Sequence, residues 1–438
     1  MIQNARLKKN QQLRLTDGRT ITVTDKLGEG GQGIVYKVRI DSTGAEKALK
    51  WYFLTKLKEP RKFYNHLQSN IDNGAPSNSF IWAEELTEYI DGEPFGYIMD
   101  IYPRGYEEFT KYLMARARFS SVKAMVDAAL NIVVAFKDLH NKGYNYQDLN
   151  DGNFSINPQN GKVLICDNDN VMGHGESSGV LGKARYMAPE VVRGEKTPDK
   201  LTDRFSLAVI LFMLLVGDHP LEGQKTNVSA LTNKNDRKFF GFEPVFMFDA
   251  TDHSNAPILG LHQNAIAMWN CFPSYIQKAF QRSFSQESLL QCKNRLLEQE
   301  WFHLLVRLKS SIVKSPYSGS EMFLECDRAM ACPDTKKSVK PVGYLRFDKR
   351  TNTEIDIPIF AGVTLYEYHM NSNSEDFVTE SAGIEEKSGK FGLRNKSNHR
   401  WSISTPSGKN ASKQNGEATA LGNGFQIDFG NGNIATVV

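Results

Sequence analysis

Hydrophobic and polar residues alternate through residues 18–53, in "RTITVTDKLGEGGQGIVYKVRI" and then "EKALKWYF". Such alternation is typical of strands with one buried face, so this stretch predicts an antiparallel sheet. Residues 59–71 follow helical spacing instead, and two more apolar strands are predicted within 79–86 and 95–102. The chain up to this point therefore indicates a domain of mixed sheet and helix.

Helical spacing takes over from residue 106 and is clearest in 120–143, where Gly143 is expected to end the helix. The longest apolar run, "FSLAVILFMLLVG" at 205–217, is too short to cross a bilayer and predicts a fully buried helix. Helices are expected to continue to about residue 310, with two short strands around the turn "NPQNG".

The composition of the chain changes after about residue 315. Residues 342–438 are rich in Thr, Ile, Phe and Val between turns such as "PSGKN" and "GNGF". This pattern predicts an all-β domain that begins near residue 320. A fragment that ends at residue 318 is accordingly expected to fold on its own.

The whole chain has 438 residues, enough for two or three domains, and a formal net charge of +3. This charge gives no general attraction to nucleic acid or to membranes, so neither is expected as a partner. The N-terminus has no apolar stretch of signal-peptide length, and the five scattered cysteines fit a reducing, cytoplasmic location. Cys326 and Cys332 could be half of a metal site, but no second pair follows them.

A glycine-rich hairpin is predicted at "GEGGQGIVYK", where Gly28, Gly30 and Gly33 have GxGxxG spacing and Val35 follows. Strand patterns flank the glycines on both sides, which argues against a dinucleotide fold, because that fold needs a helix directly after the glycines. A backbone without side chains can lie over phosphate groups. A simple flexible turn is the alternative interpretation.

Four further residues form a set suited to phosphate chemistry. Lys50 at a strand end could reach phosphate oxygens, and Asp148 could accept a proton from a hydroxyl group. Asn153 and Asp167 could bind Mg²⁺ through their hard oxygen atoms. Asp151, which precedes a glycine, is more typical of a turn.

Taken in this order, the glycine hairpin, Lys50 and the three later residues resemble the protein-kinase family. The resemblance continues in "FGYIMDIYP", "RYMAPE", "DRFSLAV" and "NRLLEQEW". It implies transfer of the ATP γ-phosphate to Ser or Thr hydroxyls of a protein substrate, with Mg²⁺ as cofactor and Mn²⁺ as the alternative metal.

The family's roles are implied for residues that match its motifs. Asp148 and Lys50 would be catalytic, and Asn153 and Asp167 would bind the metal. The implied ATP-binding residues are Gly28, Gly30, Gly33, Val35, Ala48, Lys50, Met99 (as gatekeeper) and the backbones of Asp100 and Tyr102. Three structural residues are implied as well: Asp203 would hold the catalytic-loop backbone, and Arg295 would pair with Glu190 of the Ala-Pro-Glu motif.

The resemblance also implies an α+β, two-lobed kinase-like fold. After a lead at 1–17, the N-lobe would cover 18–102 and the C-lobe 103–310. Segment 222–265 is longer than the family usually has and is expected to be an insert. The all-β domain would cover 320–438.

Several positions depart from the family pattern. The His-Arg-Asp motif reads Tyr146-Gln147-Asp148, which is a non-RD type, and the Asp-Phe-Gly motif reads Asp167-Asn168-Asp169. The lysine usually found two residues after the catalytic aspartate is Asn150. Because Gln147 cannot form a bidentate ion pair with a phosphate, activity is expected not to require phosphorylation of Ser177 or Ser178.

The helix after Lys50 lacks the acidic residue with which the family's lysine pairs. Glu59 lies too early in "EPRKFYNHLQSNID" and Asp72 too late. Asn65 or Gln68 could be neutral substitutes, so the partner of Lys50 stays open.

The C-terminal strands resemble forkhead-associated (FHA) domains, in "IPIFAGVTLYEYHM", "FGLRNKSNHRWSIST" and "ALGNGFQIDFGN". The position of the family's phosphothreonine-binding arginine falls at Glu367-Tyr368-His369, so the resemblance carries the fold and not phosphopeptide binding. The domain could bind a phosphoprotein or a phosphatase, or it could be a β-sandwich that docks on the kinase. Trp401 is expected in its core.

Two other functions are compatible with parts of the pattern. "DLNDGN" also resembles the catalytic loop of small-molecule phosphotransferases, although the Glu190 and Arg295 motifs argue against that class. The missing helix acid would suit a pseudokinase scaffold, whereas the presence of all the metal and base residues argues against it.

Overall fold

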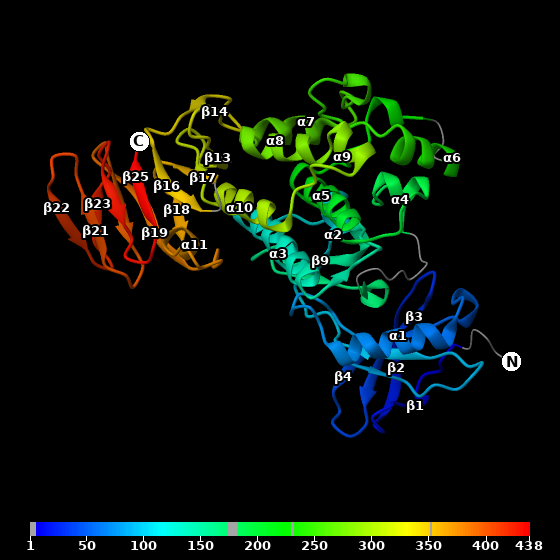
Figure 1. Ribbon diagram of the computed structural model, residues 1–438. Helices are drawn as coiled ribbons and strands as arrows, with labels where there is room; N and C mark the ends of the chain where they lie inside the picture. The colour runs from blue at the N-terminus through cyan, green and yellow to red at the C-terminus, as the bar shows by residue number, and fades with distance from the viewer. Residues whose placement is uncertain (1–5, 174–181, 229–231, 351–352) are drawn as a thin grey trace. The chain divides into compact units, whose positions relative to one another are not determined.

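The computed structural model describes residues 6–173, 182–228, 232–350 and 353–438 (Figure 1). The chain forms two compact units. The first contains residues 1–117, 134–158 and 162–206, and the second contains 118–133, 159–161 and 207–438. The first unit thus includes residues on both sides of the lobe boundary expected at 102, and the second joins later helices to the C-terminal β domain.

The first unit is built on a six-stranded antiparallel sheet. Its order is β1 (Gln12–Arg14), β2 (Thr20–Glu29), β3 (Gly33–Ile40), β4 (Glu46–Tyr52), β6 (Gly96–Met99), β5 (Glu85–Leu86). The alternating pattern puts Ile21, Val23, Ile34, Val38 and Leu49 into one hydrophobic cluster.

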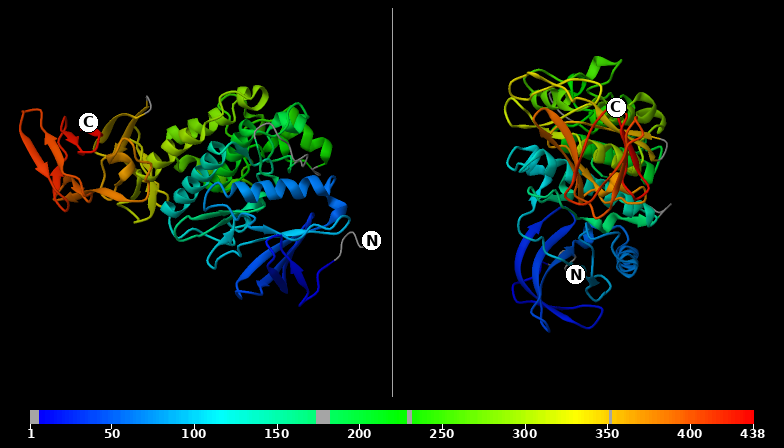
Figure 2. Two further views of the ribbon diagram at one scale, coloured as in Figure 1. Left: turned by 60° about the horizontal axis from the view of Figure 1, so that its bottom comes forward. Right: turned by 90° about the vertical axis from the view of Figure 1, so that its left-hand side faces the viewer.

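Helix α1 (Pro60–Asn73) covers the other face of this sheet (Figures 1 and 2). Its buried residues Tyr64 and Leu67 pack with Tyr52 and Tyr97 from the strands and with Phe95, which directly precedes β6. Helical spacing produces this single buried stripe, as the sequence pattern predicted for 59–71. The helix therefore lies beside the strand that carries Lys50.

A second group of elements in this unit carries the acidic residues. These elements are β7 (Glu107–Glu108), α2 (Phe109–Leu113), the later part of α3 (Val122–Asn141), β8 (Tyr144–Asn145), η2 (Asp151–Asn153), β9 (Phe154–Ile156), β10 (Val163–Ile165), η3 (Asn168–Asn170), β11 (Met172–Gly173), α4 (Pro189–Arg193) and the start of α5 (Lys200–Val216). In the hairpin of β9 and β10, Phe154 pairs with Ile165. This register brings the residues before β9 and those after β10 to the same end of the hairpin.

The second unit begins with helices packed around aromatic side chains. They include the rest of α3 and α5, α6 (Asn233–Asp236), the π-helix η5 (Arg237–Phe242), α7 (Gln263–Cys271), α8 (Ser274–Ser283), α9 (Gln286–Gln291) and α10 (Glu298–Lys309). The apolar run at 205–217 lies in or directly after α5, and its residues from 207 to 216 are buried, as predicted. In the part of the chain that the structure describes, no helix combines the length and apolarity needed to span a membrane.

Segment 222–265, which the sequence marked as an insert, supplies part of this helical core. Phe246 packs edge-on against Phe212 of α5 at 5.5 Å between ring centroids, and Phe248 stacks on Trp269 of α7 at 4.5 Å. Its extra length therefore contributes buried aromatic surface to the helices around it.

The rest of the second unit is all-β, as the composition predicted. It opens with two short hairpins, β12 (Ile312–Lys314) with β13 (Glu321–Phe323) and β14 (Met330–Ala331) with β15 (Ser338–Val339). Two antiparallel sheets follow. One has the order β17 (Thr353–Pro358), β16 (Tyr344–Arg350), β25 (Ile434–Val437), β24 (Gln426–Asp428), β21 (Trp401–Ser404), β22 (Asn410–Lys413), and the other has β18 (Thr364–Tyr366), β19 (Glu380–Lys387), β20 (Lys390–Asn395), β23 (Ala418–Ala420). Trp401 is fully buried against Phe429, as expected.

The β domain and helix α10 share polar contacts within the second unit. Lys309 of α10 forms a 2.5 Å ion pair with Asp127 of α3 and donates to the carbonyl of Phe377 at 2.8 Å. His303 Nδ1 and the Tyr368 hydroxyl are 2.5 Å apart, at the short helix α11 (Glu367–Met370). The contacts of Lys309 with Phe377 and of His303 with Tyr368 cross the domain boundary that the sequence suggested near residue 320.

Candidate active site

The catalytic loop, residues 146–153, is fixed by a buried carboxylate. Asp203 at the start of α5 accepts hydrogen bonds from the backbone N–H groups of Tyr146 at 2.6 Å and Gln147 at 3.3 Å. His140 Nε2 also lies 3.1 Å from this carboxylate. Asp203 therefore sets the path of the backbone that leads to Asp148.

Two loop residues adopt left-handed backbone conformations that are uncommon for side chains other than glycine. Gln147 has φ 64° and Asp167 has φ 56°. Each costs of the order of 1–3 kcal/mol and persists only where the surroundings impose it. The Asp203 hydrogen bonds to residues 146 and 147 supply that restraint at Gln147.

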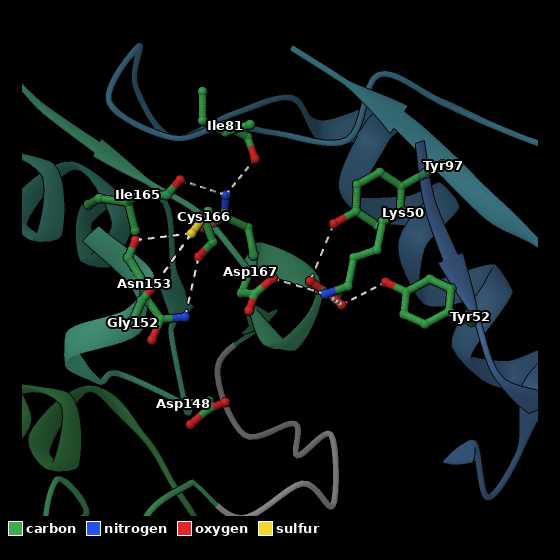
Figure 3. A network of polar contacts seen from close by, with 12 residues as sticks. Lys50, Tyr52, Ile81, Tyr97, Asp148, Gly152, Asn153, Ile165, Cys166 and Asp167 are labelled. Atoms are coloured by element: carbon green, nitrogen blue, oxygen red, sulfur yellow. Dashed lines mark hydrogen bonds and ion pairs between the residues drawn. The ribbon is translucent and has the colours of Figure 1, made fainter. Parts of the chain in front are cut away.

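The residues that depart from the family motifs are held by hydrogen bonds. Tyr146 is buried, packs on Phe136 and donates its hydroxyl hydrogen to the carbonyl of Cys166. Asn168 is also buried and donates to the carbonyls of Ile81 at 2.7 Å and Ile165 at 3.1 Å (Figure 3). Polar contacts thus fix the two segments where the family stacks apolar or aromatic side chains.

Asp148 has an electrostatic environment suited to a proton acceptor. Burial raises the pKa of its carboxyl, while a hydrogen bond from Asn150 at 3.3 Å and the charge of Lys183 act against this rise. Lys183 Nζ lies 3.4 Å from Asn150 Oδ1 and 3.6 Å from Asp151. The Lys183 ammonium group therefore lies close to Asn150, the position at which the family usually has a lysine in the catalytic loop.

This arrangement predicts a shift in pH dependence. A role of Asp148 as proton acceptor requires an ionised carboxylate, so we expect activity to fall as the pH drops through its pKa. Asn150→Ala removes the larger of the two interactions that lower the pKa of Asp148. It should therefore move the acidic limb of the kcat/KM profile to higher pH. Lys183→Ala should move it in the same direction by less. Profiles of both variants beside Lys58→Ala, which removes an exposed charge, test this; an unmoved limb in both would contradict the assignment.

Asp167 and Asn153 lie side by side at the open end of the β9–β10 hairpin (Figure 3). The Asp167 side chain is 59% exposed, and Asn153 Oδ1 accepts from the backbone of Asn150 at 3.1 Å. Among the described residues no group of three or more His, Cys, Asp or Glu could hold a metal. One carboxylate and one amide oxygen nevertheless fit Mg²⁺, which usually completes its shell with water and phosphate oxygens.

Lys50 forms ion pairs with two aspartates that follow β10. Its Nζ lies 2.5 Å from Asp169 and 3.0 Å from Asp167. The Tyr52 hydroxyl donates to Asp169 at 2.6 Å, and the Tyr97 hydroxyl lies 3.4 Å from the other oxygen (Figure 3). Burial favours the neutral amine, but Asp169 and its neighbours hold the pKa of Lys50 well above its ordinary value.

Sequence reasoning did not identify Asp169, Tyr52 or Tyr97 as site residues. A signal existed, because Lys50 and Tyr97 are paired across β4 and β6, and Tyr52 lies two residues further along β4. These three side chains therefore share one face of the sheet. Of the two neutral substitutes suggested by the sequence, Asn65 is exposed and Gln68 donates to Asp72 at 2.9 Å.

The glycine hairpin joins β2 to β3, with Gly28 paired to Val35 and Gly30 N–H donating to Gly33 at 2.9 Å. The space around a Cβ at Gly28 or Gly30 is open, whereas a Cβ at Gly33 would overlap the Trp51 carbonyl. Gly33 is therefore required by the close approach of β4, and the other two leave open backbone beside the hairpin.

The remaining ATP-binding candidates lie in β4, at the end of β6 and just after it. Ala48 is buried and pairs with Met99. The Asp100 side chain forms a 2.7 Å ion pair with Lys47. Tyr102 is 41% exposed, and burial raises the pKa of the nearby Cys166 thiol to about 12.

Two further structural candidates and the loop serines complete the set. Glu190 is buried in α4 of the first unit, and Arg295 of the second unit donates to the carbonyl of Ser288 at 3.0 Å. Ser177 and Ser178 lie outside the described residues.

Comparison with known proteins places these residues in a family. Residues 21–258, more than half of the chain, match the model of the protein kinase domain. The chain is 26% identical over 207 residues to the serine/threonine-protein kinase SCH9 of Candida albicans, covering 46% of this chain and 26% of that protein. It is 25% identical over 211 residues to a probable serine/threonine-protein kinase of Streptomyces coelicolor, SCO3848, covering 44% of this chain and 31% of that protein. It is 28% identical over 246 residues to the serine/threonine-protein kinase AtPK2/AtPK19 of Arabidopsis thaliana, covering 54% of this chain and 48% of that protein.

The chain thus spans less than half the length of these relatives. The matched segment contains the glycine hairpin, Lys50, the catalytic loop and the Asp167 turn described above. On this match, the chain belongs to the protein kinase family.

Proposed function

We propose that this protein transfers the γ-phosphate of ATP to Ser or Thr hydroxyls of protein substrates. The observation that carries the proposal is the gathering of Asp148, Asn153, Asp167 and Lys50 around one end of the β9–β10 hairpin (Figure 3). Phosphoryl transfer depends mainly on positioning and on stabilising charge, and these are the groups that such a reaction uses.

Each residue has a separate task in the proposed reaction. Asp148 accepts the hydrogen of the attacking hydroxyl and orients it. Lys50 donates to phosphate oxygens, while the backbone at Gly28 and Gly30 covers them. Asn153 and Asp167 would hold Mg²⁺, with Mn²⁺ as the alternative. The bound ion would neutralise charge on the phosphate oxygens.

We also propose that the C-terminal sandwich is FHA-like and serves as the site for a phosphoprotein or phosphatase partner. Its two antiparallel sheets support the fold. The positions 367–369 are engaged within the unit, because Tyr368 and His369 are buried and His303 contacts Tyr368. A partner would therefore bind at other loops of the sandwich. The five free cysteines agree with the cytoplasmic location expected from the sequence.

The metal assignment gives the direct test of this function. Asp167→Asn should weaken MgATP binding by at least the roughly 10- to 100-fold that even an outer-shell change costs a metal site. Affinity would be measured with Mg²⁺ and with EDTA, beside Asp72→Asn, which changes an exposed carboxylate at the end of α1. The proposal expects wild-type binding to depend on Mg²⁺ and the dependence to vanish in Asp167→Asn. Equal Mg²⁺ dependence in both proteins would contradict it.

A further inference from the structure

Helix α1 offers Lys50 no carboxylate in the structure. Its single acidic residue is Asp72, next to the C-terminal end, where it accepts a hydrogen bond from Gln68. The buried residues of the helix are Tyr64, Leu67 and Asn70. Asn70 donates to the carbonyl of Val171 at 3.2 Å, so α1 meets the segment after Asp169 through a neutral contact.

The carboxylate that pairs with Lys50 comes from the short turn η3 (Asn168–Asn170). All three of its residues are buried. Asn168 fixes the turn to the carbonyls of Ile81 and Ile165, and Asp169, whose side chain is 1% exposed, holds Lys50 and Tyr52. A buried carboxylate with these partners has little freedom to leave the lysine.

The two aspartates around Lys50 differ in surroundings. Asp167 is mostly exposed and is the proposed metal ligand, whereas Asp169 is enclosed by Lys50, Tyr52 and Tyr97. A metal ion and phosphates would compete for Asp167 and for the outer side of Lys50, while the inner contact with Asp169 would persist.

We propose that Asp169 is the positioning residue of Lys50 and replaces the acid that the family draws from the helix after this strand. This inference rests on the proposed function. It means that one short turn places both the phosphate-binding lysine and the metal-binding Asp167. Correct placement of Lys50 then needs no charged residue from α1.

A double-mutant cycle on nucleotide affinity and turnover tests this. In the wild-type background, Asp169→Asn should lower both MgATP affinity and kcat/KM by about 100-fold, the scale of a misplaced catalytic group. In a Lys50→Met background it should change affinity less than about twofold, because the group it positions is absent. Asn65→Ala and Gln68→Ala, the two neutral residues of α1, should stay near wild type.

Tyr52→Phe keeps the charges of Lys50 and Asp169, so it still tests the proposal if the Asp169→Asn variant unfolds. It removes one hydrogen bond to a buried carboxylate and should lower affinity by about tenfold, again only where Lys50 is present. Thermal unfolding of every variant separates loss of fold from loss of positioning.

Equal losses from Asp169→Asn or Tyr52→Phe with and without Lys50 would overturn the proposal, as would a loss in Asn65→Ala or Gln68→Ala as large as that in Asp169→Asn. If wild type binds MgATP but transfers no phosphate, the proposed function fails and the affinity cycle still decides on Asp169. If wild type does not bind nucleotide, both fail.

Discussion

Replacing Asp148 by asparagine is expected to lower kcat by about 100- to 10,000-fold, the usual contribution of a positioned general base. The amide keeps the size of the side chain but cannot accept the hydroxyl hydrogen as a carboxylate does. ATP affinity should stay close to that of wild type, because Lys50, Asn153 and Asp167 hold the nucleotide and metal in the proposed mechanism. Transfer of labelled phosphate from ATP to a generic protein substrate gives kcat, and nucleotide titration gives the affinity.

Asp151→Asn is the matched control for this variant. Asp151 lies three residues away in the same loop, and its carboxylate is 3.6 Å from Lys183. The same chemical change there should alter kcat by only a few-fold. Comparable loss in both variants would show that the loop needs negative charge in general, and an unchanged Asp148→Asn would remove Asp148 from the mechanism.

The candidate site was predictable from the sequence where its residues follow fixed local spacing. Asp148, Asn153 and Asp167 are close in the chain and flank one hairpin, so their order alone indicated a shared site. The contact of Lys50 with Asp169 joins residues 119 positions apart. It depends on the turn after β10 and on the pairing of β4 with β6, neither of which local spacing determines.

The fold shows the same division between local and long-range information. Alternation predicted β2, β3 and β4, two apolar runs predicted β5 and β6, and apolar spacing predicted α1, α3 and the buried α5. Strand β1 (Gln12–Arg14) was not predicted, because it lies in the segment 1–17 that was expected to be a lead. The sequence marked 222–265 as an insert from its length alone. The packing of Phe246 and Phe248 could not be predicted, because their partners are in place only when α5 and α7 are packed. Aromatic residues in an irregular segment give no periodic signal.

The composition of the chain and the contacts in the structure lead to different conclusions about the boundary near residue 320. The change in residue types there is real, since strands replace helices. However, β12 (312–314), before this point, pairs with β13 (321–323), after it. Glu321 accepts from the backbone N–H of Val122 at 2.6 Å, and Glu325 accepts from that of Ser274 at 3.0 Å. Side chains beyond the boundary thus bond to the starts of two helices, α3 and α8.

These contacts reverse the expectation for a fragment that ends at residue 318. The fragment would lack the strand partner of β12 and the ring contacts of Phe302 with Tyr368 and Phe377. Exposing a fully buried Phe costs about 1.5–3 kcal/mol, and Lys309 would also lose its bond to the Phe377 carbonyl. Unpaired edge strands and exposed aromatic surface favour association. We therefore expect fragment 1–318 to aggregate, or to unfold well below the full chain, in size-exclusion chromatography and thermal unfolding.

Single substitutions in the full chain separate this mechanism from a general effect of truncation. Tyr368→Ala removes a buried ring that packs on Phe302 and His303, and it should destabilise the protein by about 3–5 kcal/mol. Val378→Ala, at a side chain that is 67% exposed, should change the free energy of unfolding by less than about 0.5 kcal/mol. A soluble, monodisperse 1–318 fragment with the thermal stability of the full chain would instead show that the sandwich is a separable domain. In that case, Tyr368→Ala should leave the unfolding of the helical part unchanged. If Tyr368→Ala lowers the unfolding temperature of the whole second unit in one transition, the sandwich and α10 form a single cooperative structure.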